Sequence, residues 1–243
     1  MRAMFHNLEA SLAAMAGEID GAPKAVLMIS GHWEGPDFAV MASPHPPMVY
    51  DYSGFPPETY KIVYPAPGAP ELARRTLALL RGADLPAHLD DKRGFDHGVF
   101  APMAVMFPGA DVPTFQVSIR AGYDPAAHWA LGRALAPLRQ QGILIVGSGM
   151  SFHNLRALFG GVDVRERSKR FDDWLGETVA AEPEVRERRL IRWAAAPEAR
   201  FAHPREEQLL PHMVAAGAAG GEPGVRVFND TIMGAVTSGF RFG

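Results

Sequence analysis

The sequence predicts a single α/β domain, residues 1–243, with a mostly parallel or mixed central sheet flanked by helices. Two short, nearly all-apolar runs, at 25–30 and 142–147, are typical of strands buried on both faces of such a sheet. Helical patterns alternate with these runs along the chain. A chain of 243 residues that is 47% hydrophobic can also bury one substantial core.

The first half of the chain is predicted to contain two helices and two strands, with loops between them. Met4, Leu8, Leu12 and Met15 recur at helical spacing, so the chain is expected to open with an amphipathic helix, which leaves this fold without an N-terminal strand. After the strand at 25–30, the prolines and aromatic residues from 44 to 70 exclude a long helix and indicate a loop. A helix over 71–81, a loop region at 93–98 and a strand over 114–119 then follow.

The second half continues the alternation. Pro125 is placed to begin a helix that runs to about Gln140, ahead of the strand at 142–147. The charged stretch 165–192 predicts a solvated helix, with a buried side formed by Phe171, Trp174 and Leu175. A last helix is expected from Pro204 through Ala216, and strands are expected at 225–228 and 232–236.

Composition excludes several classes of function. The formal net charge of -3 gives no electrostatic footprint for nucleic acid or an anionic membrane, so a small molecule is the expected ligand. No apolar run reaches the roughly 20 residues that span a bilayer, and the N-terminus lacks a signal-peptide core, so a cytoplasmic protein is expected. The chain has no cysteine, so any metal must be held by histidine, carboxylate or water.

Two histidines follow the two apolar strands. His32 comes directly after the first strand, and His153 follows the strand at 142–147. Because ligands bind beyond the carboxyl ends of strands in open α/β sheets, we expect both side chains to face one site. Neutral imidazole binds iron and zinc and also exchanges protons near neutral pH. Spacing alone leaves open which histidine is a ligand and which is a base.

Carboxylates near these histidines would complete a metal site. Glu206, Glu207 and Gln208 are expected in the first turn of the last helix, where acidic residues are also favoured by the helix dipole alone. Two histidines and a carboxylate bind Fe(II) while leaving positions open for substrate and oxygen, and Glu207 is the preferred carboxylate. The pair Asp96-His97 can either hydrogen-bond a phenolic oxygen or close a structural turn.

Other familiar patterns do not apply. The remaining histidines considered have no partner pattern and are expected to be surface or structural: His45, His88, His128 and His212. The segment 147–152 does not complete a dinucleotide-binding glycine pattern, and no phosphate-binding loop occurs. Ser148 lies in a Gly-Ser-Gly turn, but the Gly-x-Ser-x-Gly elbow is absent, so a serine hydrolase is an alternative without its usual motif.

Seven ordered segments together resemble one family, the type III extradiol ring-cleavage dioxygenases, in the branch that includes DOPA 4,5-dioxygenases. The segments lie at 30–33, 50–56, 64–68, 94–98, 147–155, 202–207 and 240–243. The resemblance implies a single-domain α/β enzyme. It would open a catechol-type ring beside its two hydroxyls, using O2 and a non-haem divalent metal, Fe(II) or Zn(II).

The resemblance also implies roles for individual residues. His32 would be a metal ligand, and His153 would be the acid/base in iron members or a ligand in zinc-bound ones. Glu207 would lie at the carboxyl-ligand region, and His97 would border the substrate hydroxyls. Gln208 stands where some members have a further metal-site histidine.

Two departures from the family pattern support alternatives. Members begin with a strand that ends in Ser-His-Gly, whose histidine binds the metal, whereas this sequence begins at the following helix. Either the given start lies after that strand or the protein binds metal poorly. Gln208 replaces a histidine with a weaker neutral ligand. A non-catalytic or metal-poor relative that binds a small molecule or protein partner at the same place is therefore one alternative. Zinc-dependent hydrolysis at the same histidines is another.

Overall fold

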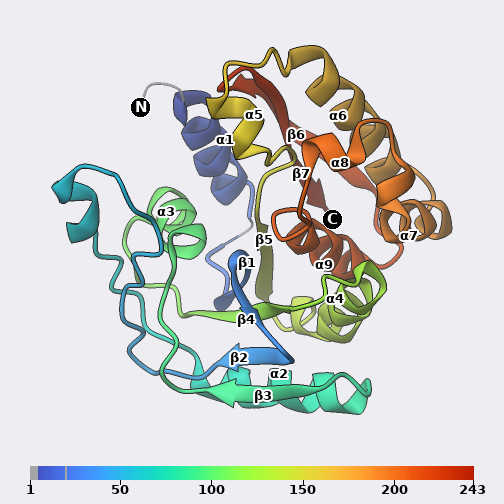
Figure 1. The fold of residues 1–243 in the computed structure, drawn as a ribbon. Helices are drawn as coiled ribbons and strands as arrows, with labels where there is room; N and C mark the ends of the chain where they lie inside the picture. The colour runs from blue at the N-terminus through green and yellow to red at the C-terminus, as the bar shows by residue number, and fades with distance from the viewer. Residues whose placement is uncertain (1–4, 20) are drawn as a thin grey trace.

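The computed structural model describes residues 5–19 and 21–243 and has a five-stranded mixed sheet at its centre (Figure 1). The strand order is β3-β2-β4-β1-β5. Strand β1 pairs in parallel with β4 and β5, whereas β2 pairs in parallel with β3 and antiparallel with β4. The five strands are β1 (Ala25–Gly35), β2 (Phe38–Met41), β3 (Ala87–Asp90), β4 (Thr114–Arg120) and β5 (Ile143–Ser148).

Strand β1 is the centre of the core. Residues 25–30 are completely buried, because β1 has a neighbouring strand on each side and helices on both faces. Full burial of side chains such as Val26, Leu27 and Ile29 stabilises the fold by about 1.5–3 kcal/mol each. Pairing of β1 with β5 ends at Ser30 opposite Ser148, so His32 lies just beyond that pairing.

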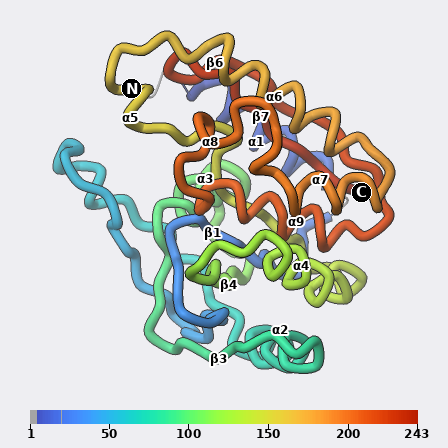
Figure 2. Tube along the Cα trace, turned by 45° about the vertical axis from the view of Figure 1, so that its right-hand side comes forward, coloured from blue at the N-terminus to red at the C-terminus, as the bar shows by residue number. Residues whose placement is uncertain are grey.

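Helices cover the sheet and position its loops. Helix α4 (Pro125–Arg139) packs against α9 (Leu210–Ala219), and α9 in turn packs against β5 and β1. Helix α2 (Pro70–Gly82) packs against β2 and β3, near the β3 edge of the sheet, and also contacts α4 (Figure 2). Helix α1 (His6–Gly17) packs against α3 (His97–Met106). The shorter elements are η2 (Pro57–Lys61), α5 (Leu155–Phe159), η3 (Trp193–Ala195) and α8 (Ala199–Ala202).

The C-terminal part adds a second layer. Strands β6 (Gly224–Ile232) and β7 (Ala235–Phe242) form an antiparallel hairpin that packs against α6 (Arg165–Val179). Phe171 and Leu175 of α6 are buried as predicted, whereas Trp174 is only half-buried. Helix α7 (Pro183–Ile191) packs against both α6 and α4.

Most predicted elements are confirmed. The helices at the start, over 71–81 and from Pro125, and the strands at 25–30, 114–119 and 142–147 are all present within a residue or a few of the expected bounds. Met4 of the predicted first helix lies outside the described residues. Within residues 5–19 no strand precedes β1. None of the helices in the described part of the chain is long and apolar enough to cross a bilayer.

Three predictions about local structure were wrong. The last helix begins at Leu210 and not at Pro204, because residues 204–209 form bends and turns and Pro211 occupies the first turn of α9. The predicted strand at 232–236 contains the hairpin turn at Met233 and Gly234, both with positive φ. The region at 93–98 leads directly into α3, a ten-residue helix whose even apolar distribution and internal Pro102 hide helical periodicity.

Candidate functional site

Three histidines meet near the carboxyl end of the parallel strands. His32 lies on β1, His97 is the first residue of α3, and His153 lies in the turn after β5. Their side chains are 27%, 35% and 17% exposed, so each is partly buried and still reachable by a small molecule. Together with Asp51, Glu207 and Gln208 they form what we call the histidine cluster.

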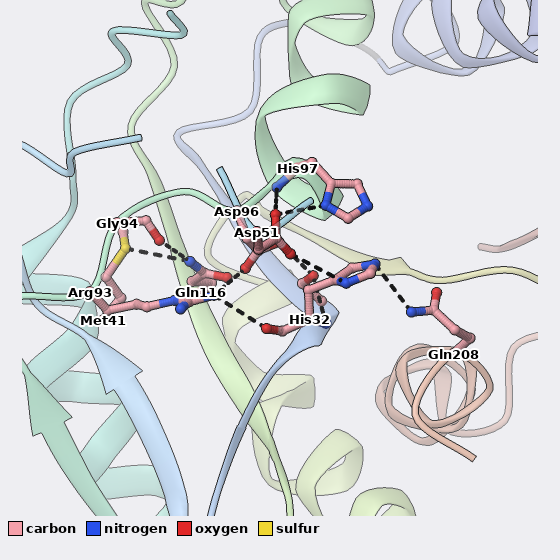
Figure 3. Close-up of polar contacts among 10 residues, drawn as sticks. His32, Met41, Asp51, Arg93, Gly94, Asp96, His97, Gln116 and Gln208 are labelled. Carbon is pink, nitrogen blue, oxygen red and sulfur yellow. Dashed lines mark hydrogen bonds and ion pairs between the residues drawn. The ribbon is translucent and has the colours of Figure 1, made fainter. Parts of the chain in front are cut away.

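Asp51 joins two of the histidines. Its Oδ1 lies 2.7 Å from Nδ1 of His97 and accepts a hydrogen bond from the His97 backbone N–H at 3.1 Å. Its Oδ2 lies 3.3 Å from Nδ1 of His32, and the two imidazole rings are 4.0 Å apart between centroids. Figure 3 shows the Asp51 carboxylate contacting both rings, with Gln208 on the other side of His32.

The charges in this part of the cluster are well defined. Burial alone would raise the pKa of Asp51, but the hydrogen bonds from His97 and the nearby imidazoles lower it to about 2, so Asp51 is ionised. Burial and the neighbouring His97 lower the pKa of His32, against the opposing influence of Asp51 and Asp96. His32 is therefore a neutral imidazole at neutral pH, the form that binds metals.

Glu207 is the partner of His153. Glu207 Oε1 lies 3.2 Å from Nδ1 of His153. Burial alone would raise the pKa of Glu207, but His153, the Glu207 backbone N–H and the charge of Arg205 together lower it. The chain folds this way because the two segments are hydrogen-bonded together. The His153 N–H donates to the Ala202 carbonyl at 3.0 Å, and the Asn154 amide donates to the Phe201 carbonyl at 2.8 Å.

The next residue, Gln208, contacts His32. Its Nε2 lies 3.1 Å from His32 Nε2, so consecutive residues of one turn reach two histidines that are far apart in the sequence. This close approach requires glycine at the strand ends. A Cβ on Gly31 would lie 2.6 Å from the Glu207 carbonyl oxygen, and a Cβ on Gly149 would lie 2.1 Å from that of Gln208.

Asp96 has a structural position behind the cluster. It is completely buried, accepts a hydrogen bond from the Ser30 hydroxyl at 2.7 Å, and pairs with Arg93 at 2.7 Å. The Ser30 hydroxyl also accepts the His32 N–H at 3.2 Å. Asp96 therefore has the structural role that was one of the two predictions for the Asp96-His97 pair, whereas His97 belongs to the cluster.

Aromatic side chains line one side of His97. The ring of Tyr52 lies 5.5 Å from that of His97 between centroids, in an edge-on arrangement. Tyr52 also packs with Tyr60 and Phe100. The Tyr52 hydroxyl donates to the Thr59 carbonyl at 2.6 Å, which fixes this part of the proline-rich loop. These contacts place aromatic surface next to His97.

The structure thus brings together every predicted site residue, in two contacting groups. His153 pairs with Glu207, and His32 contacts Gln208 and, through Asp51, His97. His153 is also close enough to His32 to lower its pKa. Sequence reasoning assigned no role to Asp51. The available signal was a lone carboxylate between Tyr50 and Tyr52 in an aromatic loop.

The residues present fit a divalent metal. Within the described residues, the ligand atoms of His32, Asp51 and His97 all lie within 4.8 Å of one another. Glu207 Oε2 is buried without a hydrogen-bond partner in this structure, although Arg205 Nε lies 3.7 Å away. Imidazole nitrogen and carboxylate oxygen suit iron and zinc, whereas the thiolate ligands of softer sites are absent from the sequence.

The other histidines are structural or exposed, as predicted. His128 is buried and contacts the Asp124 carbonyl at 2.7 Å, and His212 is half-buried against Phe240 and Phe242. His45 and His88 are exposed. His203, which the sequence reasoning left unassigned, is buried and contacts the Ser151 carbonyl at 3.1 Å through Nε2. It therefore helps hold the segment that carries His153 against the segment that leads to Glu207.

Comparison with known proteins identifies the family. Residues 2–241 match the model described as catalytic LigB subunit of aromatic ring-opening dioxygenase. The 4,5-DOPA dioxygenase extradiol of Beta vulgaris is 38% identical over 218 residues, covering 89% of this chain and 81% of that protein. Its counterpart from Escherichia coli K12 is 34% identical and covers 84% of this chain and 76% of that protein.

A solved structure agrees with the sequence comparison. An uncharacterized protein from Escherichia coli K12 superposes with a TM-score of 0.80 at 29% identity, covering 95% of this chain and 89% of that one. The family match spans nearly the whole chain, and it coincides with the fold and with the clustered histidines. The chain therefore belongs to the family of catalytic LigB subunits of aromatic ring-opening dioxygenases.

Proposed function

We propose that this protein is an extradiol dioxygenase that opens a catechol-type ring with O2 at a non-haem divalent metal, Fe(II) or Zn(II), held in the histidine cluster. One observation supports this proposal above the others. A single turn places Glu207 on His153 and Gln208 on His32, which supports assigning proton transfer to His153 and metal binding to His32. The relatives named as DOPA dioxygenases suggest a catechol that carries a side chain.

His32, Glu207 and Gln208 would hold the metal. His32 is neutral and offers Nε2, Glu207 retains an oxygen without a hydrogen-bond partner, and rotation of the Gln208 amide would present its oxygen in place of its nitrogen. When bound, the metal would act as a Lewis acid that lowers the pKa of the catechol hydroxyls and a template that holds the diol beside O2.

His153 would move protons. Because Nδ1 of His153 faces Glu207, the neutral ring keeps its proton on Nδ1 and leaves Nε2 free to accept one. In this arrangement Nε2 takes a proton from a catechol hydroxyl and returns it as the ring opens, while Glu207 stabilises the positive charge that forms on the ring. The overall reaction inserts both atoms of O2 and breaks the ring bond next to the two hydroxyls.

His97 and the aromatic residues would orient the ring. Nδ1 of His97 is held by Asp51, so its Nε2 is free to hydrogen-bond a substrate hydroxyl. The edge of Tyr52 faces His97 and offers apolar surface to an aromatic ring while excluding water. All these residues lie between 32 and 208, so we propose that residues 1–243 act as one catalytic domain.

A ring-cleavage assay tests this function. Protein loaded with Fe(II) under anaerobic conditions would be mixed with catechol or DOPA in air, and the yellow ring-opened product would be followed together with O2 consumption. We expect the two to appear in equal amounts, and we expect His153→Gln to lower kcat at least about a hundredfold. Metal-loaded protein that binds the diol but consumes no O2 would contradict the proposal.

Gln208 favours a second candidate, a metal-poor relative that binds its ligand without cleaving it. A neutral amide is a weaker ligand for iron or zinc than the imidazole or carboxylate it would stand beside. Metal analysis of purified protein separates the two candidates. Nearly stoichiometric metal that is lost in His32→Ala supports the enzyme, whereas metal-free protein with intact ligand binding supports the relative.

A further inference from the structure

Asp51 lies between two histidines and contacts the same ring atom of each. Its Oδ2 is 3.3 Å from Nδ1 of His32, and its Oδ1 is 2.7 Å from Nδ1 of His97 (Figure 3). The His97 backbone N–H donates to the same Oδ1 at 3.1 Å. One carboxylate therefore faces two imidazoles that come from different elements, β1 and α3.

The position of Asp51 is fixed by its surroundings. The flanking chain is attached to the segment before α3, where the Val49 N–H donates to the Phe95 carbonyl at 2.7 Å and the Phe95 N–H donates to the Pro47 carbonyl at 2.8 Å. Tyr50 on one side of Asp51 donates its hydroxyl to the Ile62 carbonyl at 2.7 Å. The Asp51 side chain is 18% exposed, although the residue as a whole lies at the surface.

A carboxylate in this place would select the tautomer of both rings, through its hydrogen bond with His97 and its longer 3.3 Å contact with His32. A neutral imidazole has one N–H, and a carboxylate oxygen at Nδ1 holds that proton on Nδ1. Nε2 of each ring is then an acceptor. For His32 this agrees with Gln208, whose amide N–H donates to Nε2 at 3.1 Å from the other side of the ring. Metal-binding histidines commonly use such a carboxylate to set orientation and basicity.

We propose that Asp51 is a positioning residue that holds Nδ1 of both His32 and His97. One carboxylate thereby keeps Nε2 unprotonated in both the metal-binding and the substrate-binding histidine. This rests on the proposed function for the roles of the two histidines. The alternative is that Asp51 is itself a metal ligand, since its oxygens and the two histidines lie within 4.8 Å of one another. Both oxygens of Asp51 are already used by the imidazoles, which favours positioning.

The first test needs neither metal nor turnover. Protein labelled with 15N at histidine and kept metal-free would be studied by long-range 1H–15N correlation spectra, with His32→Gln and His97→Gln assigning the two rings. We expect both rings to carry their proton on Nδ1. A ring proton on Nε2 of His32 in the unaltered protein would overturn the proposal, whatever happens in any variant.

The second test compares Asp51→Asn with a matched control, Asp173→Asn, which removes an exposed carboxylate that pairs with Lys169. The carboxamide introduced by Asp51→Asn can donate to an Nδ1, so we expect at least one ring to change to the Nε2–H tautomer. The affinity for Zn(II) alone, measured by competition with a chelating dye, should fall about 10–100-fold. The control should match the unaltered protein in both measurements.

Each other outcome has a definite meaning. Unchanged tautomers and Zn(II) affinity within about twofold in Asp51→Asn would show that Asp51 is merely structural. A loss of Zn(II) binding as complete as in His32→Ala would make Asp51 a direct ligand, and either result overturns the proposal. If His32→Ala itself retains Zn(II) affinity, the metal site in the proposed function fails instead, and the tautomers of the unaltered protein still decide the role of Asp51.

Discussion

The side-chain nitrogen of Gln208 lies 3.1 Å from Nε2 of His32, whereas Asp51 contacts Nδ1 on the other side of the same ring. The contact joins the turn before α9 to strand β1, and it puts a neutral amide against the histidine that we propose as a metal ligand. Gln208 is nearly completely buried, so its side chain has little freedom to leave this position.

Replacing Gln208 by histidine should strengthen metal binding. Imidazole is a better ligand for zinc and iron than a carboxamide, so we expect Gln208→His to raise the affinity for Zn(II) about tenfold. Competition with a chelating dye measures the change. Gln141→His, on the exposed side of the molecule, is the matched control and should have no effect. An affinity in Gln208→His equal to or below that of the unaltered protein would contradict this view of the site.

Removing the charge of Glu207 should slow turnover. The carboxylate contacts Nδ1 of His153, so Glu207→Gln would no longer stabilise a protonated ring, and we expect kcat to fall about 10–100-fold. The neighbouring Glu206 pairs with Arg200 at 2.8 Å and does not contact a histidine of the cluster, so Glu206→Gln should keep its activity. Steady-state rates on the same catechol compare the two variants. Equal rates in Glu207→Gln and Glu206→Gln would show that Glu207 has no role in the mechanism.

The glycine at 149 should be required for the turn that holds Gln208. A Cβ there would lie 2.1 Å from the Gln208 carbonyl oxygen, so Gly149→Ala must displace the turn or the end of β5. We expect a loss of roughly 1–3 kcal/mol in the free energy of unfolding, measured with urea, and lower Zn(II) affinity. Gly82→Ala is the control, because nothing lies within 4 Å of its added Cβ. Equal effects in the two variants would contradict the close approach.

Buried histidines away from the cluster should make the fold sensitive to acid. Burial lowers the pKa of His128 and of His212 from 6.5 to about 4. Between these pH values the unfolded chain binds more protons than the folded chain, so the free energy of unfolding falls as the pH falls from 6.5 to about 4. Each residue contributes on the order of 3 kcal/mol to this loss, at 1.36 kcal/mol per unit of pKa shift.

Urea unfolding between pH 7 and 4 measures this dependence. His212→Leu removes one titrating group, and its free energy of unfolding should vary less with pH than that of the unaltered protein. His88→Leu alters an exposed histidine and should leave the dependence unchanged. An identical pH dependence in all three proteins would show that burial of His212 does not shift its protonation.

Much of the fold could be predicted from local patterns, because the apolar runs at 25–30 and 142–147 mark buried parallel strands directly. The start of α9 could not be predicted so well. Pro204 and Pro211 both suit a first helical turn, and contacts of the 206–211 turn with Gly31 and Gly149 decide between them. Helix α3 escaped prediction because it is apolar on nearly all sides and has no periodic signal.

The candidate site could also be predicted only in part from the sequence. His32 and His153 could be placed from topology, since both follow parallel strands, and the resemblance added His97, Glu207 and Gln208. The pairing of Glu207 with His153, and of Gln208 with His32, depends on tertiary hydrogen bonds between the 151–154 and 201–203 segments. The position of Asp51 between Tyr50 and Tyr52 did not predict its function, because its partners lie 19 and 46 positions away in the sequence.

The most direct test of the dioxygenase assignment is O2 consumption by Fe(II)-loaded protein in the presence of a catechol, measured together with the ring-opened product. We expect one O2 to be consumed for each ring opened, and both signals to be lost in His32→Ala together with the bound iron. Iron-loaded protein that consumes no O2 with any catechol tested, or unaltered turnover in His32→Ala, would contradict the assignment.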